Sequence, residues 1–232
     1  MSSLIPAQLY LQSGERYSGL ASAARLQQEC HGEVIFNTGM VGYVESLTDP
    51  SYAGQILCFT YPLIGNYGVA AQTTWESRKI QVKGVILSEL AMFPTHYQAE
   101  QSLQQWLDQQ DIPYLLGVDT RALTHTLRGH GVVPGIITPY AQPQSEFVAF
   151  DAINWVEQVS IRTPEYFGQG NKKIIVVDCG IKENILRCLQ QFPIQIKRVP
   201  YDYDYSEEAF DGVFISNGPG DPLRCTNVKY WL

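Results

Sequence analysis

The sequence predicts an α/β protein in two parts, a mixed β/α N-terminal domain followed by the start of an open α/β sheet. Two observations support this prediction. Up to about residue 160, short β-branched or aromatic runs are bounded by Gly and Pro and are joined by few helical stretches. From residue 172 onward, continuous apolar runs flank a helical pattern, which is typical of strands buried on both faces of a parallel sheet.

The first part is predicted to be rich in strands. It begins with a β-hairpin, because residues 7–21 alternate apolar and polar side chains around a Ser13-Gly14 turn. Further strands are predicted within residues 32–39, 54–62, 80–90, 111–118 and 132–138.

Two helices are expected among these strands. The apolar residues Leu103, Trp106 and Leu107 fall on one face of a helix. A second helix is predicted over residues 119–131, because Asp119 is a suitable N-cap and glycine occurs near the end of the segment. We therefore assign residues 1–160 to one domain, which consists mainly of strands with a few helices.

The second part of the sequence has a different pattern of apolar and polar residues. Residues 161–171 are polar and glycine-bearing, so we interpret them as a linker to a domain over residues 172–232. That domain is predicted to start with a strand at 173–180 and a helix at 181–192. A strand at 194–200 and a third strand leading into a glycine-rich loop follow, which is the opening of an open α/β sheet.

Composition limits the function classes. The formal net charge of −7 and the absence of a basic run argue against nucleic acid as a partner. No apolar stretch approaches the roughly 18 to 20 residues needed to span a bilayer, so no membrane role is expected, and no signal-peptide pattern is seen. The five cysteines are scattered without a CxxC pair. We therefore expect a reducing, cytoplasmic setting, no disulfide framework and no metal site.

The loop SNGPGDP follows the last predicted strand, where ligands bind in open α/β sheets. Gly218 and Gly220 have no side chain, so their backbone N–H groups can approach a ligand and form an oxyanion site for acyl transfer. Asp221 and Pro222 have the order of an N-cap and a first helical residue. Taken by itself, the loop is more simply interpreted as a tight turn, since Gly-Pro-Gly stretches commonly form turns.

Several segments together resemble one family. Residues 32–69 closely resemble the N-terminal domain of the small, glutamine-hydrolysing subunit of carbamoyl-phosphate synthase. The run GVDTRALTHTLRGHG looks like that family's next landmark. Residues 176–189 and 214–222 resemble the opening of its class I glutamine amidotransferase domain. The resemblance spans about Leu9 to Cys225 and implies that the second part is the incomplete start of that domain.

The resemblance also implies a reaction and its partners. The family's small subunit hydrolyses L-glutamine through a cysteine thioester and passes ammonia to a large synthetase subunit. The large subunit, which binds ATP and Mg²⁺, makes carbamoyl phosphate for arginine and pyrimidine biosynthesis. No cofactor is expected in the small subunit itself.

Three positions match the family's glutamine-binding residues. Ser51 looks like the serine that reaches from the N-terminal domain to hold glutamine. Gly218 and Gly220 look like the glycines whose backbone contacts glutamine and its oxyanion. Three neighbours are expected only to shape these loops, namely Asp49, Tyr52 and Asn217.

The family's nucleophile lies in a Gly-x-Cys-x-Gly turn that is followed by a His and a Glu, and this sequence contains no such turn. Cys179 and Cys188 are interpreted as structural. Cys225 lies near a possible helix start but has no His after it. We therefore assign no catalytic residue, and we expect a C-terminally truncated chain that is inactive as a glutaminase on its own.

Two functions stay open at this point. The chain is either an enzyme subunit of glutamine-dependent carbamoyl-phosphate synthase or a non-catalytic fragment that binds the large subunit. A different class I amidotransferase is disfavoured, because those families do not carry a domain like residues 32–69 ahead of the glutaminase.

Overall fold

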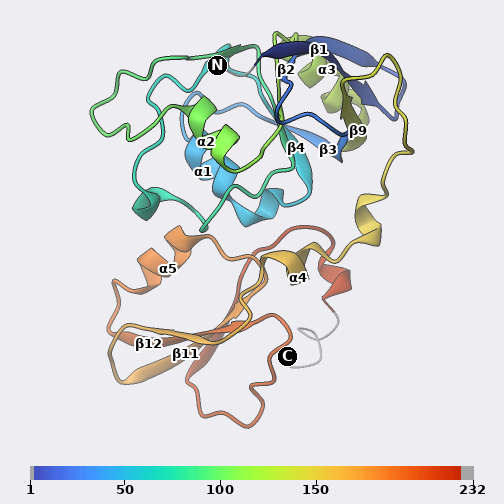
Figure 1. Ribbon diagram of the computed structural model, residues 1–232. Helices are drawn as coiled ribbons and strands as arrows, with labels where there is room; N and C mark the ends of the chain where they lie inside the picture. The colour runs from blue at the N-terminus through green and yellow to red at the C-terminus, as the bar shows by residue number, and fades with distance from the viewer. Residues whose placement is uncertain (1–2, 226–232) are drawn as a thin grey trace. The chain divides into compact units, whose positions relative to one another are not determined.

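The structure is a computed structural model that describes residues 3–225 (Figure 1). The chain divides into two compact units. Within the described residues, unit 1 comprises residues 3–48 and 54–150, and unit 2 comprises Asp49–Ala53 and residues 151–225. The mixed α/β class predicted from the sequence is confirmed.

Unit 1 is built around a closed β-barrel. In order around the barrel, its strands are β1 (Leu4–Leu11), β2 (Arg16–Ser22), β8 (Tyr114–Leu116), β6 (Gly84–Ile86), β4 (Gln55–Phe59), β3 (Cys30–Asn37) and β9 (Val133–Thr138). The predicted hairpin is confirmed as the antiparallel β1–β2 pair. Strands β3, β4, β6 and β8 run parallel to one another, so their carboxyl ends lie at one end of the barrel.

The segment predicted as one strand at residues 80–90 contains two. Strand β6 belongs to the barrel, whereas β7 (Glu89–Leu90) pairs in parallel with β5 (Leu63–Ile64) in a separate small sheet. The split allows the chain to leave the barrel after β6.

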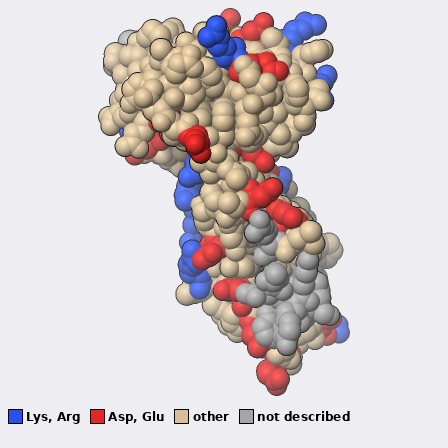
Figure 2. Space-filling view, turned by 90° about the vertical axis from the view of Figure 1, so that its right-hand side faces the viewer, with Lys and Arg blue, Asp and Glu red and all other residues tan. Residues whose placement is uncertain are grey.

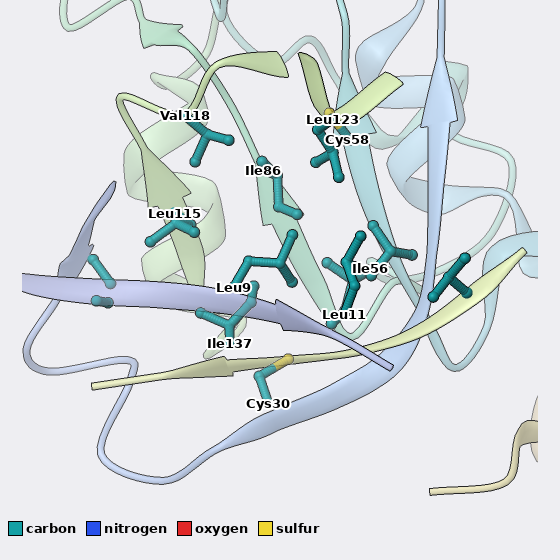
Figure 3. Close-up of a cluster of buried hydrophobic side chains, with 14 of the residues drawn as sticks. Leu9, Leu11, Cys30, Ile56, Cys58, Ile86, Leu115, Val118, Leu123 and Ile137 are labelled. Carbon is teal, nitrogen blue, oxygen red and sulfur yellow. The ribbon is translucent and has the colours of Figure 1, made fainter. Parts of the chain in front are cut away.

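The barrel interior is filled by apolar side chains. Leu9, Ile56, Ile86, Leu115 and Ile137 are fully buried there. Figure 3 shows these side chains pointing toward one another from different strands. Buried and less buried residues alternate along β1, because successive residues of a strand face opposite sides of a sheet. This alternation explains why Leu9 points into the barrel.

Three α-helices belong to unit 1, namely α1 (Tyr43–Thr48), α2 (Leu103–Gln109) and α3 (Thr120–His130). The predicted cap is confirmed, because the Asp119 carboxylate accepts a hydrogen bond of 2.9 Å from the Ala122 backbone N–H. Gly131 ends α3 with a φ of +80°, which only glycine adopts freely. Helix α1 was not predicted, since its six residues are too few for a clear periodicity.

Unit 2 is a four-stranded sheet in the order β10 (Glu165–Phe167), β12 (Ile194–Pro200), β11 (Lys172–Asp178) and β13 (Gly212–Ile215). The pairs β11–β12 and β11–β13 are parallel, as expected, and β10 is antiparallel to β12. Helix α5 (Glu183–Leu189) follows β11 and packs Leu186 into the sheet. Helix α4 (Trp155–Val159) completes the unit.

The segment expected to be a linker is instead part of unit 2. Strand β10 lies within residues 161–171, and the division between the units falls at Phe150, before α4, rather than near residue 160. The physical reason is apolar packing, because Val156 of α4 is buried in the same cluster as Ile175 of β11.

Short 3₁₀ helices complete the described chain, namely η1 (Pro50–Tyr52), η2 (Gln72–Thr74), η3 (Phe150–Ala152) and η4 (Pro222–Arg224). The helix start expected at Asp221 is confirmed for η4, where its carboxylate accepts from the Leu223 N–H at 2.8 Å. Over residues 3–225, no helix combines the length and the apolar content needed to cross a bilayer.

The barrel core provides a first prediction. Leu9→Ala should lower the free energy of unfolding of unit 1 by about 2–5 kcal/mol, because it leaves a cavity among fully buried side chains. Leu4→Ala is the matched control on the same strand, since Leu4 is 44% exposed. Urea unfolding, monitored by hydrogen exchange of the β1 and β9 amides, measures the free energy of unfolding of both variants. Equal effects of the two substitutions would contradict the assigned register.

Candidate functional site

The candidate site lies where strands β11 and β13 end. These strands are parallel neighbours, so the loops that follow them meet at one edge of the sheet. The Ser216 N–H donates to the Val177 carbonyl at 3.1 Å, and the Cys179 N–H donates to the Ser216 hydroxyl oxygen at 2.9 Å. The two loops are therefore joined by hydrogen bonds directly beyond the sheet.

Glycine is required at two positions of the second loop. A Cβ atom on Gly218 would clash with the carbonyl oxygen of Cys179, so no other residue fits without a shift. Gly220 has a φ of +75°, which is strained for any residue with a side chain. Neither glycine N–H donates a hydrogen bond to any group within residues 3–225, and both glycines are accessible to solvent. Two backbone donors are thus available to a ligand.

Ser51 joins this loop through the segment Asp49–Ala53, which belongs to unit 2. The Asn217 side-chain amide donates to the Ser51 hydroxyl oxygen at 2.7 Å. The Ser51 N–H in turn donates to the Asp49 carboxylate at 2.9 Å, and the Lys182 ammonium lies 2.6 Å from the other carboxylate oxygen of Asp49. The structure therefore brings Ser51 to the residue that precedes Gly218.

Two of the three residues expected to shape the loops, Asp49 and Asn217, make polar contacts within them. Asp49 caps η1 and pairs with Lys182, and Asn217 positions the hydroxyl of Ser51. Since the Ser51 oxygen accepts from Asn217, its own hydroxyl proton stays available for donation to a ligand.

A buried ion pair holds the first loop, and sequence reasoning did not identify it. Asp178 is fully buried at the end of β11, and its carboxylate lies 2.9 Å from the Arg198 guanidinium of β12. The same carboxylate accepts hydrogen bonds from the N–H groups of Gly180 at 2.9 Å and Ile181 at 2.8 Å. The available signal was an Asp that directly ends the apolar run KIIVVD.

The cysteines of unit 2 do not form a nucleophilic centre with an imidazole. Burial raises the pKa of the Cys179 thiol to about 12, so it stays protonated at neutral pH. Cys179 and Cys225 are buried in one apolar cluster, which agrees with the structural role expected for Cys179. Cys188 was also expected to be structural, but it is exposed on α5, on a different side of the helix from the buried Leu186. All histidines of the sequence precede residue 151, outside the sequence ranges of unit 2.

Metal ligands were not expected. Throughout the part of the chain that the structure describes, no group of three His, Cys, Asp or Glu side chains is arranged to hold a metal ion.

The two units match two different family models. Residues 9–137 match the family model for the CPSase domain of the carbamoyl-phosphate synthase small chain. Residues 175–230 match the family model for class I glutamine amidotransferases. The first match covers more than half of the chain, so the chain belongs to the carbamoyl-phosphate synthase small chain family.

Individual relatives agree with this assignment. The carbamoyl phosphate synthase arginine-specific small chain of Candida albicans is 42% identical over 98% of this chain and 57% of its own length. The protein of the same description from Halalkalibacterium halodurans is 42% identical over 94% of this chain and 61% of its own length. The multifunctional protein pyr1-3 of Dictyostelium discoideum is 41% identical over 94% of this chain and 11% of its own length. The chain thus spans little more than half of the small chains that it matches.

The Asp178–Arg198 pair yields the second prediction. Arg198→Met should lower the free energy of unfolding of unit 2 by about 3–5 kcal/mol, because it leaves the buried Asp178 carboxylate without its cation. Arg162→Met is the control, since Arg162 is exposed in the same unit. Hydrogen exchange should show lost protection in β11 and β12 with the barrel strands unchanged. Full protection in the Arg198 variant would show that the pair does not hold the sheet.

Proposed function

We propose that this chain acts as the small subunit of a glutamine-dependent carbamoyl-phosphate synthase, which supplies ammonia for arginine and pyrimidine biosynthesis. The observation that carries the proposal is the grouping of Ser51 with the Gly218–Gly220 loop in a unit that matches class I glutamine amidotransferases. The arginine-specific description of several relatives supports the arginine branch in particular.

L-Glutamine is the proposed ligand of this site. The free N–H groups of Gly218 and Gly220 are suited to the carboxamide oxygen of glutamine, on which negative charge develops during hydrolysis. The Ser51 hydroxyl would donate to a polar group of the same molecule. The ion pair of Asp49 with Lys182 keeps the serine in place before the ligand arrives.

Glutamine hydrolysis is not expected from residues 1–232 by themselves. They contain no Gly-x-Cys-x-Gly turn, and the high pKa of Cys179 makes it a poor nucleophile. We assign no catalytic residue within this stretch. ATP and Mg²⁺ are proposed as ligands of a large synthetase subunit, and no cofactor is proposed for this chain.

Glutamine binding tests the site directly. Ser51→Ala should weaken the binding of L-glutamine by about 3- to 10-fold, the usual loss when one hydrogen bond is removed. Ser206→Ala is the matched control, because Ser206 is exposed elsewhere in unit 2. Isothermal titration with L-glutamine, with D-glutamine as the ligand control, measures the change. Identical affinities for the two serine variants would exclude Ser51 from the site.

A second candidate function is a non-catalytic one, in which the chain only binds the large subunit. A set of exposed apolar side chains on unit 1 favours such an interaction. We call it the apolar patch, and it consists of Met40, Val41, Leu63, Met92, Phe93 and Tyr97. Leu63 lies on β5, which pairs with β7, and the ring of Tyr97 contacts His96 in a tilted arrangement. Exposed apolar groups of this kind commonly mark protein interfaces.

Substitution in the apolar patch tests the interaction. Phe93→Ser should weaken binding to a purified carbamoyl-phosphate synthase large subunit by at least about tenfold, because Phe93 is 82% exposed and would be an aromatic anchor. Phe192→Ser is the control, since Phe192 is 61% exposed but belongs to unit 2. Binding is measured by surface plasmon resonance. Binding of the large subunit without any binding of L-glutamine would favour the second candidate, and an unchanged Phe93 variant would exclude the patch.

A further inference from the structure

Unit 1 contains a cavity that the proposed glutamine site does not use. Its volume is about 750 Å³, within the range of small-molecule sites. Three hydroxyl residues line it just beyond the carboxyl ends of parallel strands, namely Thr38 after β3, Thr60 after β4 and Ser88 after β6. Val118, which follows β8, lines it as well. The cavity thus occupies the end of the barrel where parallel strands direct their loops, a common position for ligands.

Helix α3 supplies the charged wall of this cavity. Arg121, His125 and Arg128 all line it, and their spacing of four and three residues places them on one face of the helix. The opposite side of α3 is anchored, because Leu123 and Leu127 are buried in the barrel core. Figure 3 shows Leu123 among the buried side chains of that core. The cationic side chains are therefore carried by a helix that the core holds in place.

These polar groups are available to a ligand. Neither Arg121 nor Arg128 forms an ion pair with a carboxylate in residues 3–225, and the guanidinium of Arg128 lies 5.7 Å from the centre of the Phe36 ring. The hydroxyls of Thr60 and Ser88 likewise make no hydrogen bond to the described protein. A guanidinium over an aromatic ring keeps its edge free for an anion.

The local charge is opposite to that of the chain. The whole sequence carries a net charge of −7, and acidic groups are spread over the face shown in Figure 2. The cavity lining nevertheless contains two guanidinium groups against one carboxylate, Asp119, which already caps α3. Proteins commonly bind phosphate and carboxylate oxygens with such a combination of cationic side chains and hydroxyl donors.

We propose that this cavity binds a small anionic molecule through its phosphate or carboxylate oxygens. Arg121 and Arg128 provide the charge-assisted hydrogen bonds, and Thr38, Thr60 and Ser88 provide neutral donors from the barrel end. The site lies in unit 1 and does not depend on the proposed glutamine function.

Titration of the full chain with inorganic phosphate and, separately, with citrate tests the proposal and distinguishes the two anion chemistries. Arg121→Gln combined with Arg128→Gln should weaken binding of the better probe by at least about tenfold, because charge-assisted hydrogen bonds are lost. Arg16→Gln, an exposed arginine on β2, is the matched control and should bind normally. Ser51→Ala should also bind normally, which separates this site from the glutamine site.

Thr60→Val provides a second variant that keeps the shape of the side chain and removes its hydroxyl. It should weaken the same probe by about 3- to 10-fold while the charge stays unchanged. Equal affinity in the double arginine variant and the wild type would overturn the proposal. The proposal would also be overturned if neither phosphate nor citrate binds. This includes the case in which only an acidic peptide binds.

Discussion

The buried pair of Asp178 and Arg198 is the interaction on which the arrangement of unit 2 depends. Removing two charges from water is costly unless the remaining donors and acceptors are satisfied. Here the carboxylate also accepts the N–H groups of Gly180 and Ile181, and the guanidinium also bonds to Glu183 of α5 at 2.9 Å. The pair therefore fixes the strand, the turn and the helix start together. Because that turn carries Cys179, it also fixes the carbonyl oxygen against which Gly218 packs.

The position of the Cys179 carbonyl oxygen determines which groups the glycine loop can present to a ligand. A side chain at Gly218 has no room, so the loop presents backbone donors instead of side chains. Ser51 is held to the same loop by polar contacts, through Asn217 and through the Asp49–Lys182 ion pair. The candidate site thus consists of a rigid turn and a segment attached to it by hydrogen bonds and one ion pair. Such a site can be ordered before a ligand binds, which lowers the cost of binding.

The sequence allowed most elements of the fold to be predicted, but not their closure. Local patterns identified the β1–β2 hairpin, α3 with its Asp119 cap, and the β11–α5–β12 order. The barrel depends on pairing between β1 and β9, which are far apart in the sequence, so no local pattern reveals it. The site residues Ser51, Gly218 and Gly220 came from a family resemblance. The Asp178–Arg198 pair was missed, because an ion pair between two strands leaves no spacing rule in the sequence.

The two candidate sites follow one physical rule in different folds. In unit 2, an open parallel sheet places the ends of β11 and β13 side by side, and their loops converge. In unit 1, the parallel strands β3, β4, β6 and β8 impose the same convergence within a closed barrel. The sites differ in what they offer a ligand. The unit 2 loop offers uncharged backbone donors, which suit an amide oxygen, whereas the unit 1 cavity offers guanidinium groups, which suit a full negative charge. That difference in charge, rather than their similar position in the fold, is why we propose different ligands for the two sites.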